Sequence, residues 1–228
     1  MYWLLKVLCG RLLLAWFPVK VSGTETLPRQ GPCIVAINHQ SFIDSLIIPA
    51  ALPRRVTYPA KREYFVKPGI KGALQRWFFE GVGQIPIDRT GGEAATTALD
   101  AGMEVLRAGG VFGIYPEGTR SPDGRLYRGK TGVARLAMAT GAPIYPIAVT
   151  GTRAAQPEGS TLPRRSPVTV TVGKPVLCPP GDPSVRDEAT HQALRQCTDE
   201  VMNQLATMLG QVVQPEYGSE AKARLRGQ

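Results

Sequence analysis

The sequence predicts a single α/β domain with a mostly parallel central sheet flanked by helices. Along most of the 228 residues, short apolar runs of strand length alternate with longer amphipathic stretches, an order typical of layered α/β domains. The run from Cys33 to Ile37 is apolar at every position, as expected for a strand buried on both faces of a parallel sheet. A hydrophobic fraction of 43% is ample for the core of one such domain.

The order of the elements follows from these patterns. The predicted strands occupy residues 19–24, 33–37, 55–58, 84–87, 111–115, 143–149 and 168–172. The predicted helices lie between them or after them, at residues 44–51, 70–79, 92–108, 131–140 and 184–209. Glycines at 109–110 and at 141 end two of the helices in the way that helix C-termini favour. In such sheets the chemistry collects where strands end and helices begin.

The two ends of the chain differ from this central domain, which we place at residues 18–213. Residues 1–17 are aliphatic and aromatic but are interrupted by Lys6 and Arg11. This segment is too short and too charged for a spanning helix, which needs about 20 apolar residues, and no cleavage site of a signal peptide follows it.

We therefore predict that residues 1–17 form an amphipathic helix in the membrane interface. Lys6 and Arg11 would then reach anionic phosphates, and the residues at headgroup depth would be Tyr2, Trp3, Trp16 and Phe17. The alternative is a helix packed on the protein's own sheet. Residues 214–228 are expected to be a polar, frayed tail.

The charge and the cysteines narrow the class of protein. A net charge of +9 implies an anionic partner, which is a nucleic acid, an anionic lipid or a phosphorylated substrate. The sequence has no recognised nucleic-acid motif, so nucleic acid is the poorest of the three candidate partners.

The cysteines (Cys9, Cys33, Cys178 and Cys197) are widely separated, and with only two histidines no zinc site is expected. We expect them to be reduced and mostly buried, in a cytosolic protein.

The first group of chemically competent residues is His39 and Asp44. Five residues on a helix span about 140° beyond a full turn, at about 100° per residue, so the two cannot share one helical face. They can meet if His39 lies in a loop at the end of a strand and Asp44 lies in the first turn of the next helix. The carboxylate then fixes one imidazole nitrogen, and the other can take a proton from a hydroxyl. A histidine that only caps or packs remains the alternative.

Ser41, between these two residues, raises the question of a serine nucleophile. The G-x-S-x-G pattern of such nucleophiles is absent. We instead expect Ser41 to be an ordinary helix N-cap.

The second group lies in residues 115–121, directly after a predicted buried strand. Glu117 and Arg120, in a loop built around Gly118, are suited to a polyol phosphate, with carboxylate to hydroxyl and guanidinium to phosphate. Thr119 and Ser121 add hydroxyl groups. The alternative is a surface turn with a salt bridge of little energetic weight.

Four segments resemble, in order and in spacing, the four motif blocks of the lysophosphatidic acid (1-acylglycerol-3-phosphate) acyltransferase family: residues 38–44, 85–89, 115–121 and 142–147. The resemblance covers about residues 19–172, and residues 84–89 and 124–136 look most like the actinobacterial members. It implies that His39 is the general base and Asp44 its orienter. It also implies a glycerol-phosphate site made of Lys61, Arg89, Glu117, Gly118, Thr119 and Arg120. Residues 144–149 would line the acyl region or serve only as a core strand.

One departure from the family pattern is Pro86, where many members have an aromatic or aliphatic residue. It leaves Arg89 in place.

By this resemblance, the expected reaction moves a fatty acyl group from acyl-CoA or acyl carrier protein to a hydroxyl of 1-acylglycerol 3-phosphate, giving phosphatidic acid for phospholipid synthesis. No metal or other cofactor is expected. The alternatives are acylation of the central (sn-2) hydroxyl of glycerol 3-phosphate itself, and a non-catalytic membrane lipid-binding module. The expected location is the cytoplasmic face of the cell membrane, peripheral or monotopic, with residues 71–79 as a second basic and aromatic patch on the bilayer.

Overall fold

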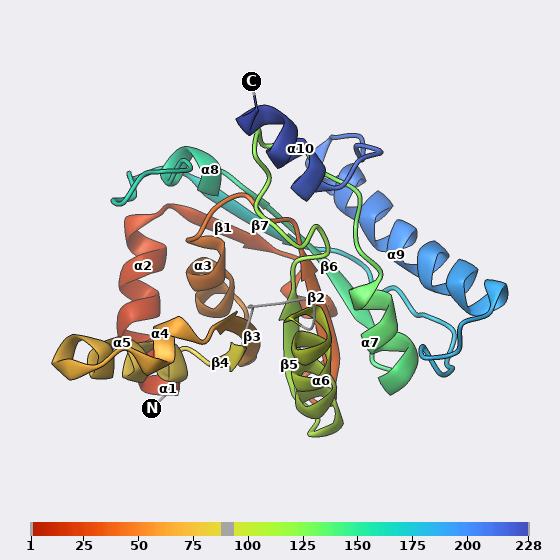
Figure 1. The fold of residues 1–228 in the computed structure, drawn as a ribbon. Helices are drawn as coiled ribbons and strands as arrows, with labels where there is room; N and C mark the ends of the chain where they lie inside the picture. The colour runs from red at the N-terminus through yellow and green to blue at the C-terminus, as the bar shows by residue number, and fades with distance from the viewer. Residues whose placement is uncertain (1, 88–93, 228) are drawn as a thin grey trace.

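The computed structural model describes residues 2–87 and 94–227 and has a seven-stranded sheet at its centre (Figure 1). The strand order is β1-β7-β6-β2-β5-β3-β4. The strands are β1 (Val19–Ser22), β2 (Cys33–Ile37), β3 (Val56–Lys61), β4 (Gln84–Ile87), β5 (Val111–Ile114), β6 (Ile144–Thr150) and β7 (Val168–Val172). Adjacent strands are parallel except β6 and β7, which are antiparallel. The predicted α/β domain with a mostly parallel sheet is confirmed.

Helices cover both faces of this sheet. They are α1 (Tyr2–Leu5), α2 (Arg11–Trp16), α3 (Asp44–Ala51), α4 (Glu63–Val66), α5 (Gly69–Gly81), α6 (Ala94–Arg107), α7 (Gly132–Thr140), α8 (Thr152–Ala155), α9 (Glu188–Leu209) and α10 (Gly218–Arg226). Figure 1 shows α2 and α3 on one side of the sheet and α7 and α9 on the other. The long helices therefore match the predicted ones to within a few residues, while the short α4 and α8 were not predicted.

The strand β2 shows how its sequence suits both layers. Successive side chains of a strand point to opposite faces. Ile34 and Ala36 accordingly pack among α6, α7 and α9, in one apolar cluster. The alternate residues of β2 (Cys33, Val35 and Ile37) pack with Ile47 and Ile48 of α3 in a second cluster. All five positions are buried, which is why the apolar run has no polar alternation.

The N-terminal segment packs on the domain along one side. After α1, a π-helical segment (Lys6–Gly10) leads into α2, and Phe17 is buried in the same cluster as α3, with Leu13 and Leu14 against it. The Lys6 ammonium donates a hydrogen bond to the backbone carbonyl of Leu52, and burial lowers the pKa of Lys6 to about 8.

Three expectations for this segment are therefore wrong. Lys6 points into the protein rather than toward phosphates, and Tyr2 and Phe17 are buried rather than at headgroup depth. The other side of the segment remains exposed, and Leu12 is 73% exposed there. In the parts of the chain that the structure describes, no helix has the length and apolarity needed to cross a membrane.

The C-terminal residues were expected to fray, and for 218–226 this is wrong. They form α10, which begins where the Glu220 carboxylate accepts the backbone N–H of Tyr217 at 3.0 Å. Lys222 Nζ pairs with Glu158 Oε1 at 2.7 Å, and Ala221 is fully buried. The helix is held by contacts with segments distant in the sequence, which a polar composition does not reveal.

The expectation of four reduced cysteines is also wrong. Cys178 and Cys197 form a disulfide, with their Cα atoms 5.6 Å apart. It joins the segment after β7 to α9, two regions that only the tertiary fold brings together. Cys9 and Cys33 are free thiols, and burial raises the pKa of Cys33 to about 11.

Candidate active site

His39 and Asp44 meet at the junction between β2 and α3. β2 ends at Ile37, His39 lies in the loop that follows, and Asp44 is the first residue of α3. His39 Nδ1 lies 2.9 Å from Asp44 Oδ2. The predicted meeting of the two side chains is confirmed, as is its cause, a loop and a first helical turn rather than one helical face.

The Asp44 carboxylate is fixed by its surroundings. It is fully buried, and Oδ2 also accepts the backbone N–H groups of Gln40 and Ser41, each at 2.8 Å. With Nδ1 donating to this oxygen, the other imidazole nitrogen, Nε2, is the one that can accept a proton. The His39 side chain is 16% exposed, so the imidazole is not sealed inside the protein.

Ser41 is not the N-cap of α3, contrary to expectation. The N-cap is Ile43, which has no side-chain capping bond. The buried Ser41 hydroxyl instead donates to the backbone carbonyl of Gln156 at 2.8 Å, so it ties the loop to the chain after α8. In this position it acts as a structural link between loops.

An aromatic ring that was not predicted as a site residue covers the imidazole. The rings of Tyr115 and His39 are stacked, with centroids 3.8 Å apart and planes 14° from parallel. The Tyr115 hydroxyl lies 2.8 Å from Ser45 Oγ, one residue after Asp44. The base is therefore held at its edge by the carboxylate and over its face by Tyr115. The one sequence signal was the place of Tyr115 at the start of the 115–121 segment.

Asn38 is a second structural residue that sequence reasoning did not assign. Its buried side-chain amide donates to the Val149 carbonyl at 2.9 Å and accepts the Val149 N–H at 2.7 Å. The pair joins the ends of β2 and β6 immediately before His39. It thus fixes where the loop with the base leaves the sheet.

Glu117 is buried next to the backbone of His39 and does not lie on the surface. Its side chain is 1% exposed; Oε1 accepts the backbone N–H of His39 at 2.9 Å, and Oε2 accepts that of Tyr127 at 3.0 Å. Burial raises the pKa of Glu117 to about 7, although the two N–H donors favour the charged form. The alternative of a surface turn with a salt bridge is wrong. A contact between Glu117 and a substrate hydroxyl stays a prediction, and both of its oxygens already have partners.

The rest of the 115–121 segment is tied to the same loop. The Ser121 N–H donates to the His39 carbonyl at 2.8 Å, and Arg153 donates to the carbonyls of Ser121 and Pro122 at 3.0 and 2.7 Å. Gly118 has a left-handed φ of +71° and lies at the surface, where a Cβ would come within 3.2 Å of the Lys130 side chain. Lys130 therefore lies alongside Gly118.

Thr119 and Arg120 are half-buried beside Gly118. Among the described residues, the Arg120 guanidinium has no hydrogen bond or ion pair, and its charge helps to lower the pKa of Glu158, after the stronger effect of Lys222. Arg120 is thus open to an anionic ligand.

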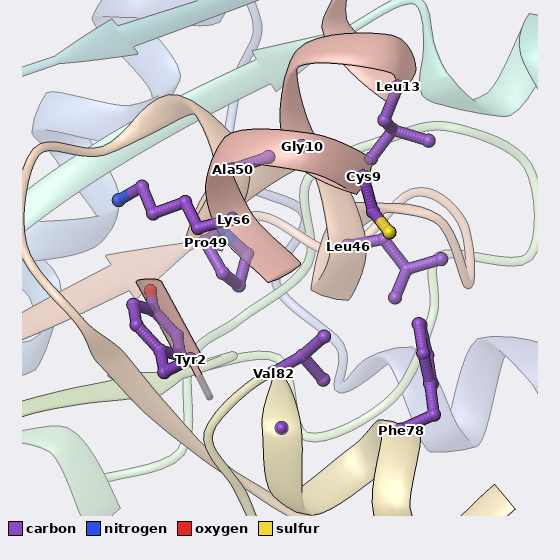
Figure 2. Close-up of a pocket in the computed structure, with 11 residues that line it drawn as sticks. Tyr2, Lys6, Cys9, Gly10, Leu13, Leu46, Pro49, Ala50, Phe78 and Val82 are labelled. Atoms are coloured by element: carbon purple, nitrogen blue, oxygen red, sulfur yellow. The ribbon is translucent and has the colours of Figure 1, made fainter. Parts of the chain in front are cut away.

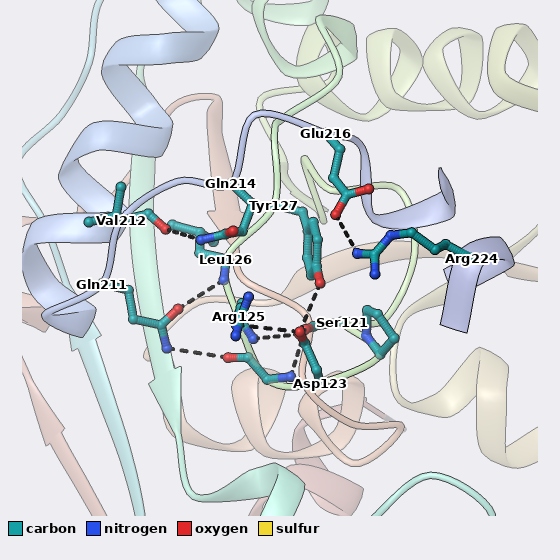
Figure 3. A network of polar contacts seen from close by, with 12 residues as sticks. Ser121, Asp123, Arg125, Leu126, Tyr127, Gln211, Val212, Gln214, Glu216 and Arg224 are labelled. Carbon is teal, nitrogen blue, oxygen red and sulfur yellow. Dashed lines mark hydrogen bonds and ion pairs between the residues drawn. The ribbon is translucent and has the colours of Figure 1, made fainter. Parts of the chain in front are cut away.

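A polar network braces this loop from the C-terminal side (Figure 3). The Tyr127 hydroxyl donates to Asp123 Oδ2 at 3.0 Å, and the Gly124 N–H donates to Ser121 Oγ at 2.9 Å. From the chain after α9, Gln211 accepts the Leu126 N–H at 2.8 Å and donates to the Gly124 carbonyl at 3.3 Å. The loop that carries Glu117 and Arg120 is therefore positioned by residues near the C-terminus.

The remaining predicted site residues are placed only in part. Lys61 is the last residue of β3 and therefore lies at the carboxyl edge of the sheet. The neighbouring parallel strands β5 and β2 end at the same edge. Arg89 lies outside the described residues. The strand β6, with Ile144 to Val149 buried in the middle of the sheet, packs into both apolar clusters. This position favours the structural role for residues 144–149 over a role in lining an acyl site.

The comparison with known families agrees with this site. A family profile described as "Acyltransferase" matches residues 18–150, more than half of the chain. The chain therefore belongs to the acyltransferase family. The match includes both the His39–Asp44 pair and the 115–121 segment.

The names of individual relatives specify a reaction more closely than the family description does. The 1-acyl-sn-glycerol-3-phosphate acyltransferase BAT2, chloroplastic, of Brassica napus is 32% identical over 163 residues, which is 71% of this chain and 46% of the relative. The 1-acyl-sn-glycerol-3-phosphate acyltransferase of Bacillus subtilis is 28% identical over 160 residues, covering 69% of this chain and 73% of that protein. The chain spans about half the length of several curated relatives that it matches.

A solved structure has the same fold. The crystal structure of the 1-acyl-sn-glycerophosphate acyltransferase PlsC from Thermotoga maritima is similar with a TM-score of 0.67 and 28% sequence identity. The similarity covers 88% of this chain and 76% of that one.

Proposed function

We propose that this protein transfers a fatty acyl group from an acyl thioester to a hydroxyl of 1-acylglycerol 3-phosphate, giving phosphatidic acid. The observation that carries the proposal is the 2.9 Å contact between His39 Nδ1 and the buried Asp44 carboxylate, in a member of the acyltransferase family. The choice of acceptor is supported by the names of the relatives, several of which are 1-acyl-sn-glycerol-3-phosphate acyltransferases.

In the proposed reaction His39 acts as general base. Nε2 accepts the proton of the acceptor hydroxyl while the hydroxyl oxygen bonds to the thioester carbon, and Asp44 stabilises the imidazolium that forms. The tetrahedral intermediate then collapses, the carbon–sulfur bond breaks, and the departing sulfur takes the proton back from Nε2. The donor is acyl-CoA or acyl carrier protein, and the step uses no metal or other cofactor.

The acceptor phosphate is proposed to lie against the exposed backbone of Gly118. Arg120 on one side has no ion pair among the described residues, and the Lys130 side chain lies alongside Gly118. A guanidinium offers a planar pair of donors to phosphate, and an ammonium adds a point charge. The predicted contributions of Lys61, Thr119 and Arg89 remain part of this proposal.

The membrane is proposed as the source of the acceptor. The outward side of α1 and α2 exposes Trp3, Leu12 and Trp16, and α5 exposes Ile70, Leu74 and Trp77, with Ile70 at 90% exposure. The basic residues Lys67, Lys71 and Arg76 lie in or next to α5. Apolar side chains with cations beside them suit an anionic bilayer surface. We propose peripheral or monotopic attachment to the cytoplasmic face of the cell membrane.

A cavity of about 140 Å³ lies between the N-terminal segment, α3 and α5 (Figure 2). Its wall includes Leu13, Leu46, Pro49, Phe78 and Val82 and is almost entirely apolar. The helix α3 begins with Asp44 and lines this cavity further along. We propose that it receives part of an acyl chain, between the bilayer face and the catalytic pair.

The test is an assay of purified protein with radiolabelled acyl thioester, offered 1-acylglycerol 3-phosphate or glycerol 3-phosphate in separate reactions. His39→Ala is expected to lower turnover at least about a hundredfold, while His191→Ala, at the exposed other histidine on α9, leaves it unchanged. If product forms only with glycerol 3-phosphate, the acceptor is glycerol 3-phosphate itself and not 1-acylglycerol 3-phosphate. Vesicle binding without any consumption of thioester would replace the enzyme by a lipid-binding module.

A further inference from the structure

Five buried side-chain polar atoms have no hydrogen-bond partner among the described residues, and two of the five concern the His39–Asp44 pair. One is Asp44 Oδ1, the carboxylate oxygen that does not face His39, and the other is the hydroxyl of Tyr58. A carboxylate oxygen accepts and a phenol donates, so the two groups complement each other. Leaving either one unsatisfied in the interior costs free energy.

Tyr58 belongs to the same aromatic stack as the base. Its side chain, on β3, is buried with the ring 5.8 Å from that of Tyr115 and 22° from parallel, and Tyr115 is in turn stacked on His39. The ring lies across Gly113 of β5, where the Cβ of any other residue would overlap it. The glycine therefore makes room for Tyr58 directly beside the catalytic pair.

Electrostatic effects also place Tyr58 near Asp44. Burial is the first cause that raises the pKa of Tyr58 well above its ordinary value, and the neighbouring Tyr115, Asp44 and Tyr2 add to it. A negative carboxylate acts on the phenol in this way only when the two groups share a poorly solvated region. The phenol therefore keeps its proton and remains a donor.

We propose that Tyr58 is a positioning residue for the His39–Asp44 pair, and that its hydroxyl donates to Asp44 Oδ1 through one buried water molecule. No direct hydrogen bond joins the two atoms, and a buried water needs about two to four polar partners. The Tyr115 hydroxyl, which meets Ser45 beside Asp44, offers such a water a third polar neighbour.

The consequence for the base follows from the two carboxylate oxygens. Oδ2 receives His39 Nδ1 and two backbone N–H groups, and the Tyr58 hydroxyl would hold Oδ1. A donor on Oδ1 draws negative charge away from Oδ2, so Oδ2 stabilises the imidazolium less than it would without that donor. The other titratable groups that face the pair are Glu117 below His39, Tyr115 on its ring and Tyr2 beside Tyr58, and replacing the Tyr58 hydroxyl leaves them in place.

The test is the titration of the His39 ring protons by NMR in the Tyr58→Phe variant, which loses one oxygen and keeps the stacked ring. Only two histidines are present, so His191→Ala assigns the signals. The His39 midpoint is expected to rise by about 0.5 to 1 pH unit, since one hydrogen bond to a charged group is lost. The matched control is Tyr145→Phe, another buried tyrosine, whose titratable neighbours are the Cys33 thiol at the start of β2 and Arg54 beside that thiol, at the other end of the strand from His39.

The catalytic part of the inference rests on the proposed function, but the titration needs no substrate, so the two can fail separately. Turnover of Tyr58→Phe at pH 7 is expected to fall about fivefold through kcat, with KM unchanged. The acidic limb of its pH–rate profile should shift to higher pH together with the NMR midpoint. An unchanged His39 titration together with a higher melting temperature would overturn the proposal, because the hydroxyl would then be an unpartnered group whose removal is favourable. A crystal structure without a water between Tyr58 and Asp44 would also contradict it.

Discussion

The Glu117 carboxylate accepts the backbone N–H of His39 at 2.9 Å, and so the 115–121 segment holds the loop that carries the base. Its other oxygen accepts the Tyr127 N–H at 3.0 Å. This one buried side chain therefore joins the loop after β2 to both ends of the loop after β5. Its main effect in this position is on the placement of the base.

Glu117→Gln is expected to destabilise the protein by about 1–3 kcal/mol and to lower kcat more than it raises KM. A glutamine has only one side-chain oxygen, so its amide nitrogen would face one of the two backbone N–H donors and leave that donor unsatisfied. Urea unfolding and steady-state kinetics measure the two effects. A large rise in KM with unchanged stability would instead show that Glu117 contacts the acceptor.

The pH dependence of stability should carry the signature of Glu117. Its pKa is about 7 in the folded protein against an ordinary 4.5, so between these values the folded state binds more protons than the unfolded state. The contribution of this group is complete below about pH 4.5 and is lost as the pH rises through 7, amounting to about 3 kcal/mol for a shift of this size. The free energy of unfolding should fall from pH 5 to pH 7.5 in the wild type by more than in Glu117→Gln. Equal slopes in the two proteins would contradict this.

Asp44→Asn is expected to lower kcat at least about a hundredfold. The amide cannot stabilise an imidazolium as a carboxylate does, and the three donors on Oδ2 would compete for a neutral oxygen. The matched control is Asp199→Asn, whose carboxylate pairs with Arg195 on the surface of α9. Turnover close to the wild-type level in Asp44→Asn would remove the carboxylate from the mechanism.

Membrane attachment should depend on the outward side of the N-terminal segment. The double change Leu12→Glu and Trp16→Glu is expected to weaken sedimentation with phosphatidylglycerol vesicles about tenfold or more, because each residue loses the gain from burying an apolar side chain. Circular dichroism checks folding, and Leu177→Glu, exposed on a different segment, is the control. Point changes are preferable to deletion since Phe17 and its neighbours pack into the core. Undiminished sedimentation would leave α5 as the attachment site.

The sequence by itself determined the α/β class and the order of the main elements, and it predicted the geometry in which His39 and Asp44 can meet. These follow from local rules, because strand and helix periodicity are written in consecutive residues and the His39–Asp44 contact spans only one loop and one helical turn. Even the disposition of β2 followed from its five apolar residues, since a strand buried on both faces needs no polar alternation.

Only the tertiary structure decided what touches those residues. The Glu117 carboxylate under His39, the Tyr115 and Tyr58 rings beside it, the Asn38–Val149 link and the Cys178–Cys197 disulfide all join segments far apart in the chain. The partner of Lys6 was likewise decided by the tertiary structure. The local amphipathic pattern predicted that Lys6 faces lipid, whereas in the fold its ammonium donates to the Leu52 carbonyl. Sequence patterns report which side chains avoid water, whereas the partner that satisfies a buried polar group depends on how distant elements pack.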